Sequence, residues 1–539
     1  MNALDKSSMV ERSTTVRFFR WLCSRRTLRH VLIGLAWLVT LVALFHGEEN
    51  WRGRRAWDRY RRALEAEGAQ LDFRALVPKP LPDEQNFAAA PVIKSWFEKH
   101  GPAGVDEEWE DNYARAGTRI YPPKAKGGPA NRLPEDLVAW EERFGAAGSG
   151  KTTGKEQFYP GKTDPESRAK AASWVLTALR TNEALFAELR LASGRPDSRY
   201  PIRYDLENVW AIEFPHLRMI KGVCQRLELK ACAELACGQS EKALEDARLM
   251  LRLADSLRGE PCLISYLIRL ACIQLMTQPV WEGLAEHRWS EAQLQELQTR
   301  LLQYNFIADM KPALEAERAA GLSTIELLRR KGPWYLNWIG ASEATPPPGP
   351  SILGKLIGAV LVPRGWYYQE ELNYCRGFQA ELATGLDLSN NRVSPAGAKA
   401  DAAAVERVLG ATGFAGTGLG VVLHHKFMSR MLLPALTRVI LKSAAAQTAF
   451  NQAAVACALE RYRLANGGFP DKLDALVSQF MSTLPNDVLT GEPYRYRRMD
   501  DGRFVLYSVG WDEKDDDGVP GKTFYDEKQG DWVWEYPAK

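Results

Sequence analysis

The chain has 539 residues, of which 45% are hydrophobic and 25% are charged, close to the composition of an ordinary globular protein. This composition excludes a wholly disordered chain, a collagen-like chain and a protein with many membrane spans. The formal net charge is only +3, so no overall basic excess favours nucleic-acid binding. The charge is uneven, however: residues 1–62 carry 13 Lys and Arg against 5 Asp and Glu, whereas residues 471–539 carry 9 against 15.

An uncharged apolar run, VLIGLAWLVTLVALF at 31–45, predicts a single transmembrane anchor, which we place at residues 31–46. At 1.5 Å per residue the run covers about 22 Å, short of a hydrocarbon core of about 30 Å, so the helix must extend at its ends. A cleaved signal peptide or a buried core helix can have an apolar run of this length. We favour an uncleaved anchor because no small-x-small cleavage site follows the run.

The charges beside the span predict its orientation. Arg25, Arg26 and Arg29 lie close before it, whereas the nearest charges after it are Glu48 and Glu49. Because cytoplasmic flanks are rich in Lys and Arg, we expect a cytoplasmic N-terminal tail and an extracytoplasmic (periplasmic) body. The stretch after the span, WRGRRAWDRYRRALEAE at 51–67, is typical of a basic amphipathic helix at a membrane surface.

The rest of the chain is predicted to be mainly α-helical. Apolar residues at three- and four-residue spacing predict helices over 262–286, 290–304, 309–330, 366–384 and 426–465, with Ser290 as an N-cap and a polar loop over 388–400. The segment around Gly238 resembles one tetratricopeptide-type helical hairpin, but no second copy follows at about 34 residues. The predicted regions are 1–30, a basic cytoplasmic tail; 31–46, the anchor; 47–165, a juxtamembrane helix and an irregular Gly- and Pro-rich region; 166–330, a helical body; 331–425, a linker with helical segments; and 426–539, a long helix with a small α+β module.

The last region carries an ordered set of motifs: ALERYRLANGGFPDKLDALV at 458–477, LPNDVLTGEPYRYR at 484–497 and FVLYSVGWDEKDDDG at 504–518. In this order they resemble the C-terminal half of the major pseudopilin of type II secretion systems. The resemblance implies a helix ended by Asn466-Gly467, a short helix and a small sheet. The pseudopilin cleavage motif is absent and the predicted span lies far upstream, so assembly by a continuous N-terminal helix is not expected. The whole chain also resembles large, uncharacterised membrane-anchored bacterial proteins.

Alternating residues in these last segments predict which side of the sheet meets the helix. We expect Tyr494, Tyr496, Val505 and Tyr507 to face it, because side chains alternate along a strand.

The acidic loop after this module's Leu-Tyr-Ser-x-Gly segment is the candidate metal site. Clustered carboxylates are relieved either by solvation or by a hard cation such as Ca²⁺, and both alternatives stay open. In pseudopilins the corresponding loop binds calcium, and the resemblance implies that role for Asp512 and Asp515, with Ser508 and Asp517 as further ligands. A complete EF-hand is excluded because its twelfth position is Phe524, not Glu.

Other motifs are weak. Gly145–Thr152 fits a phosphate-binding loop by pattern, but a polar helical run precedes it where a buried strand is needed, so no nucleotide is predicted. No catalytic signature is evident, and most of the eight cysteines are expected to be small buried residues. The leading hypothesis is a non-catalytic, membrane-anchored protein in interaction, scaffolding or secretion-related assembly with envelope proteins. The alternatives are an exported enzyme or a ligand-binding protein with a site in the helical body.

Overall fold

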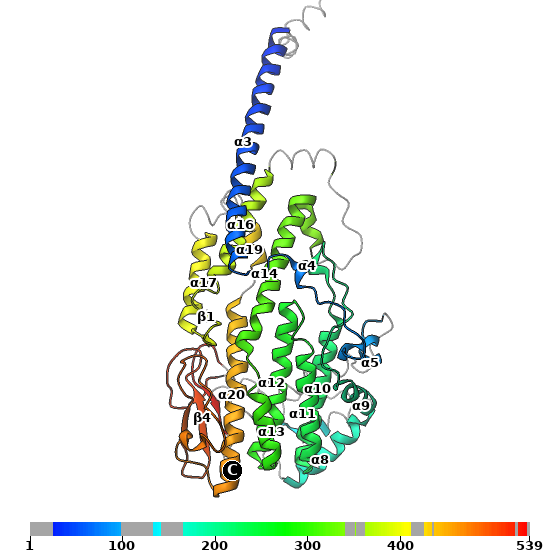
Figure 1. The fold of residues 1–539 in the computed structure, drawn as a ribbon, viewed down its shortest axis with the longest axis vertical. Helices are drawn as coiled ribbons and strands as arrows, with labels where there is room; N and C mark the ends of the chain where they lie inside the picture. The colour runs from blue at the N-terminus through cyan, green and yellow to red at the C-terminus, as the bar shows by residue number, and fades with distance from the viewer. Residues whose placement is uncertain are drawn as a thin grey trace, which may run out of the picture.

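The computed structural model describes residues 25–98, 133–141, 165–339, 351, 362–410, 425–433, 436–522 and 526–535. These residues are mainly helical with a small C-terminal sheet, so the predicted fold class is confirmed at that level. Figure 1 shows the long helices of the body standing side by side, the strands beside the lower part of α20, and α3 projecting from the opposite end.

Eleven helices of at least six residues follow α3 (Arg25–Ala66) in the described part of the chain. They are α8 (Pro165–Ala178), α9 (Glu183–Ala192), α10 (Pro215–Ala236), α11 (Ser240–Asp255), α12 (Leu263–Ala285), α13 (Glu291–Leu301), α14 (Phe306–Lys331), α16 (Arg364–Ala380), α17 (Pro395–Leu409), α19 (Phe427–Leu432) and α20 (Leu436–Asn466). Shorter helices are α4 (Phe73–Leu76) and α5 (Pro91–Ser95), with 3₁₀ turns at Phe87–Ala89, Leu179–Asn182, Val209–Ala211, Pro333–Trp338 and Leu473–Leu476.

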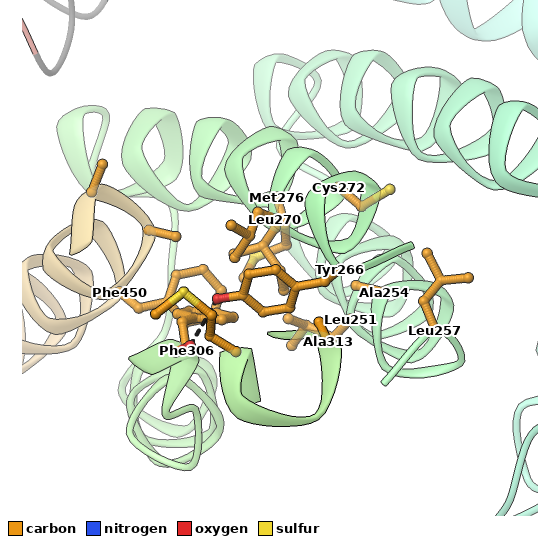
Figure 2. Close-up of a cluster of buried hydrophobic side chains, with 14 of the residues drawn as sticks. Leu251, Ala254, Leu257, Tyr266, Leu270, Cys272, Met276, Phe306, Ala313 and Phe450 are labelled. Atoms are coloured by element: carbon orange, nitrogen blue, oxygen red, sulfur yellow. Dashed lines mark hydrogen bonds between the residues drawn. The ribbon is translucent and has the colours of Figure 1, made fainter. Parts of the chain in front are cut away.

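The core is built around α20, which packs against α12, α13 and α14 on one side and against β4 and β5 on the other. Its residues from Ser443 to Glu460 are buried without interruption. In Figure 2, Phe306 of α14 and Phe450 of α20 lie beside Tyr266 of α12; the two phenylalanine rings meet edge to face at 5.1 Å. The Tyr266 hydroxyl donates to the Phe306 carbonyl at 2.7 Å, so the hydroxyl has a hydrogen-bond partner inside an apolar layer.

Local signals in the sequence placed three helix boundaries correctly, whereas the helix predicted over 426–465 is divided into α19 and α20. Ser290 caps α13 in a capping box with Gln293, as Ser-x-x-Gln predicts. Gly238, with a φ of +73°, separates α10 from α11 as expected, because glycine tolerates this left-handed conformation. Gly467 (φ +82°) ends α20 in the same way.

The predicted loop over 388–400 is partly wrong. A hairpin of β1 (Leu386–Asp387) and β2 (Arg392–Val393) occupies its first part, and α17 begins at Pro395. The Ser394 side chain accepts from the amide of Gly397, so Ser394-Pro395 is an N-cap followed by proline at the first helical position. Pro434, within the predicted long helix, lies outside the described residues.

The C-terminal sheet is antiparallel, with β4 (Phe504–Ser508) between β3 (Arg495–Arg498) and β5 (Trp532–Trp534). The register pairs Tyr496 with Leu506 and Tyr507 with Arg495. Since paired residues share a face, Tyr496 lies on the face of Leu506, which belongs to the main core cluster. The prediction that Val505 and Tyr507 face the helix is therefore wrong: they lie on the other face, under Gly518 of the acidic loop.

Two described helices are long and apolar enough to cross a membrane by length and composition, α3 and α12. The apolar window of α12 is 67% buried inside the body, whereas that of α3 is 0% buried. The burial of α12 identifies it as a core helix of the body. The seven described cysteines are free, and five of them are buried, as predicted: Cys224, Cys232, Cys272, Cys375 and Cys457.

Candidate functional site

The α3 helix has two halves with opposite surroundings. From Leu28 to Phe45 its large apolar side chains other than Val42 are exposed, with fractions between 46% and 65%. In the second half, Glu49, Gly53, Trp57 and Leu64 are buried. The helix is continuous between them, so the predicted span of residues 31–46 is joined to the folded body without a loop (Figure 1).

The second half of α3 packs along α16, and the two helices touch at a pair of glycines. A Cβ atom added to Gly53 would overlap the carbonyl oxygen of Gly365, and a Cβ added to Gly365 would overlap the carbonyl oxygen of Glu49. Glycine is the residue that permits such a close backbone approach. We call this contact, made by Glu49, Asn50, Gly53, Gly365 and Trp366, the anchor junction.

Polar contacts close the anchor junction at the first turn of α16. The Asn50 side chain accepts from the amide of Gly365 at 2.6 Å, so a residue of α3 satisfies one of the free amides at the start of α16. The indole of Trp366 donates to the Glu49 carboxylate at 3.2 Å, and Arg52 pairs with the same carboxylate at 2.5 Å. Glu49 therefore lies at the positive end of the α16 dipole with a cation beside it.

The contact between the helices continues away from the span. The Tyr60 hydroxyl donates to the Gln379 side chain at 2.7 Å, and the Arg376 guanidinium lies 5.6 Å from the centre of the Tyr60 ring. Burial raises the pKa of the Tyr60 phenol. Contacts from Gly365 to Gln379 follow almost the whole of α16, so α3 and the body are held as one unit.

In the acidic loop, the predicted ligands Asp512 and Asp515 contact groups of the chain itself. Asp515 pairs with Arg495 of β3 at 3.0 Å. Asp512 accepts from the amide of Lys514 in a local turn, and Asp515 accepts in the same way from the amide of Asp517. Within the described residues, no three His, Cys, Asp or Glu side chains are grouped so that they could hold a metal ion.

Ser508 lies apart from the three aspartates. It shares its strand face with Leu506, and its hydroxyl accepts from the amide of Gly510 at 3.4 Å, whereas Asp515 belongs to the opposite, Tyr507 side. A buried carboxylate, that of Asp531, accepts from the amides of Asp516 and Gly518 in the loop. Burial raises the pKa of Asp531 to about 6. Of the four predicted ligands, Ser508 therefore lies on the opposite side of the strand from Asp515, and Arg495 places a positive charge beside Asp515.

A buried polar group in the body was not foreseen from the sequence. His216 of α10 contacts Glu260 at 2.7 Å through Nε2, and Ser265 of α12 donates to the other oxygen of Glu260 at 2.5 Å. The imidazole stacks on Tyr200 with 4.1 Å between ring centres. His216 is 0% exposed, so this group is sealed inside the body and joins the starts of α10 and α12.

A second buried charge group links α9, α10 and α11. Asp246, which is 0% exposed, pairs with Lys230 at 2.8 Å and with Arg190 at 2.5 Å. Glu234 also pairs with Lys230. Burial acts to lower the pKa of Lys230, but Asp246 and Glu234 outweigh it, and the pKa is raised. Buried charges that are paired in this way hold helices in one register.

Asn86, in the polar segment Asp83–Phe87, caps one segment and docks it on another. The Asn86 side chain accepts from the amide of Ala88 at 3.1 Å and from the amide of Arg199 at 2.8 Å. It therefore caps a short turn and docks it onto the segment before α10. The Gly145–Thr152 motif lies outside the described residues.

No protein-family model, curated protein or solved structure matched the chain. The pseudopilin resemblance of the C-terminal region, and the calcium site that it implies, therefore stay predictions from the residues alone.

Proposed function

We propose that this protein is a single-pass membrane protein whose helical body stands on the extracytoplasmic (periplasmic) side and acts as a scaffold or interaction platform, in secretion-related assembly at the envelope. The observation that carries this proposal is α3, which is exposed and apolar in its first half and part of the body core in its second. A soluble protein rarely exposes so large an apolar surface, and a bilayer would cover it.

The anchor junction supports an uncleaved anchor. Glu49 and Asn50 make hydrogen bonds to the first turn of α16, and Gly53 packs beside them. If a peptidase removed the span, these three residues would become part of a fraying N-terminus, and the contacts would be weakened. Retention of the span keeps the helix continuous. A rigid connection of this kind fixes the orientation of the body relative to the bilayer, which suits a platform that must present one surface to a partner.

The enzyme alternative receives less support from the body. Its most distinctive titratable group, His216 with Glu260 and Ser265, is buried under Tyr200 and Phe97. A catalytic histidine must reach its substrate, so complete burial favours a packing role for this group.

The proposal can be tested in bacterial cells that produce the full chain. We expect the protein to stay in the membrane fraction after carbonate extraction and to keep its N-terminal residues. A C-terminal alkaline phosphatase fusion should be active, because this reporter folds only outside the cytoplasm. Release by carbonate, or an inactive fusion beside an active cytoplasmic reporter, would contradict the proposed anchoring or orientation.

The interaction role needs its own experiment. We expect affinity purification from detergent-solubilised membranes to recover a defined envelope protein at constant stoichiometry. A control fusion of residues 1–46 to an unrelated periplasmic protein recovers the partners bound by the anchor alone, so that the remaining partners are those bound by the body. Recovery of no envelope component would count against the scaffold proposal while leaving the anchoring intact.

A further inference from the structure

The outer face of α3, just beyond the span, carries exposed basic and aromatic side chains. Trp51 is 62% exposed, and the Arg55 guanidinium lies 5.3 Å from the centre of its ring. The side chain of Arg54 is 71% exposed. Trp51 and Arg55 lie on the side of α3 away from Gly53 and Trp57, which pack on the body. Arg54 lies at the edge between the two sides, because successive residues are about 100° apart around the helix.

The charges on this face are weakly partnered inside the protein. Arg54 is 3.7 Å from Asp58, an exposed contact of the kind that adds little stability. The described residues include no carboxylate paired with Arg55 or Arg59, and Arg62 donates only to the backbone carbonyl of Asp58. The guanidinium groups are therefore available to an external anion.

Rigid docking of α3 fixes how far each arginine lies from the bilayer. The uncharged stretch that contains the span ends at Gly47, directly before Glu48. The headgroup layer beyond the hydrocarbon is roughly 5–8 Å deep. At 1.5 Å per residue, Trp51 lies about 6 Å beyond Gly47, Arg54 and Arg55 about 10–12 Å, and Arg59 and Arg62 about 18–22 Å.

The direction of helical side chains decides which of these residues reach the lipid. Each Cα–Cβ bond tilts toward the N-terminus of its helix, which for α3 is the side of the bilayer. Arg54 and Arg55 can therefore snorkel back into the headgroup layer, with Trp51 at the depth that interfacial tryptophans prefer. Arg59 and Arg62 have the same charge on the same helix but lie beyond that reach.

We propose that Trp51, Arg54 and Arg55 form a collar that binds the headgroups of anionic phospholipids and seats the body at a fixed height on the membrane. This inference rests on the proposed membrane anchoring. Basic residues close to an anionic surface attract it, and the attraction decays within about 8–10 Å at physiological salt. Beyond a headgroup layer of roughly 5–8 Å, Arg54 and Arg55 lie about 2–7 Å from the lipid surface, inside this range. Arg59 and Arg62 lie about 10–17 Å from that surface, at or beyond its limit.

The test uses the full chain in liposomes of phosphatidylcholine and phosphatidylglycerol that contain a dansyl label on one or the other lipid. Energy transfer from tryptophan to the dansyl group reports which lipid gathers at the protein. We expect several-fold stronger transfer to labelled phosphatidylglycerol than to labelled phosphatidylcholine at equal mole fraction. The preference should weaken as NaCl is raised.

The double variant Arg54→Gln/Arg55→Gln should lose this preference, whereas the matched control Arg59→Gln/Arg62→Gln should keep it. Flotation of both variants with the liposomes confirms that the span still anchors them, and equal melting temperatures confirm that the body is folded. A wild-type protein without lipid preference, or an equal loss in both variants, would overturn the collar. Failure of the wild type to float would instead overturn the anchoring on which the collar depends.

Discussion

Gly53 of α3 and Gly365 of α16 lie at the point where the backbones of the predicted anchor and the body touch. Neither position can take a side chain without moving a helix, and the amide of Gly365 is already held by Asn50. The close approach thus joins the exposed apolar half of α3 to the folded body.

A larger side chain at Gly53 should destabilise the protein. Gly53→Leu forces α3 away from α16, and overpacking of this kind costs about 1–3 kcal/mol. We expect a lower melting temperature for the full chain in detergent. Gly47→Leu is the matched control because no atom lies within 4 Å of the Cβ at that position. Equal melting temperatures for the two variants would show that the anchor junction adds no stability.

The buried Asp246 should be far more sensitive than a surface carboxylate. Asp246→Ala leaves Lys230 and Arg190 without their shared partner, and breaking a buried pair costs roughly 3–5 kcal/mol. The control is Glu296→Ala, which removes a half-exposed partner of Arg248 and should cost about 1 kcal/mol or less. Urea unfolding followed by circular dichroism measures both. Similar losses of unfolding free energy in the two variants would mean that Asp246 is exposed to water in the folded protein.

The ionisation of Glu135 should make the free energy of unfolding depend on pH. Burial raises the pKa of this carboxyl to about 8, from about 4.3 in an unfolded chain. Between these two pKa values the folded state therefore binds more protons than the unfolded state. As a result, the free energy of unfolding falls as pH rises from about 4.3 to 8. Glu135 lowers it by at most about 1.4 kcal/mol per pH unit. The loss is complete above pH 8.

The variant Glu135→Gln isolates this contribution. Its carbonyl can still accept from the Trp140 indole, which now donates to Glu135, but it has no proton to lose. We expect the difference in unfolding free energy between variant and wild type to grow in favour of the variant from pH 5 to pH 8. A difference that stays constant over this range would exclude a protonated Glu135 in the folded protein.

The sequence allowed helix positions to be predicted where the signal is local. The capping box of Ser290 and Gln293 sets the start of α13, and Gly238 and Gly467 each end a helix. Each signal lies within a few residues of the helix end that it sets, so a short stretch of sequence is enough to predict that end. The face of β4 could not be predicted, because alternation gives two opposite assignments that only the partner strands distinguish. The pairing of Tyr496 with Leu506 decides between them.

Contacts between distant segments were also out of reach of the sequence. Asp246 meets Arg190 across 56 positions, and Asn50 meets Gly365 across 315; neither pair has a local pattern. The acidic loop is a further example. Its composition favoured a bound cation, but Arg495, on the strand β3, places a positive charge beside Asp515, and no local pattern links these two residues.

The calcium prediction can be decided through that arginine. If the loop binds Ca²⁺ with the millimolar affinity typical of weak extracellular sites, 10 mM Ca²⁺ should stabilise the folded state by about 1.4 kcal/mol and raise the melting temperature. Arg495→Gln removes the charge that neutralises Asp515, so Ca²⁺ should bind this variant more tightly and shift its melting temperature further. Asp515→Asn should abolish the shift. Titration calorimetry without heat, together with unchanged melting temperatures in wild type and Arg495→Gln, would show that the loop is closed by its own arginine and takes no calcium.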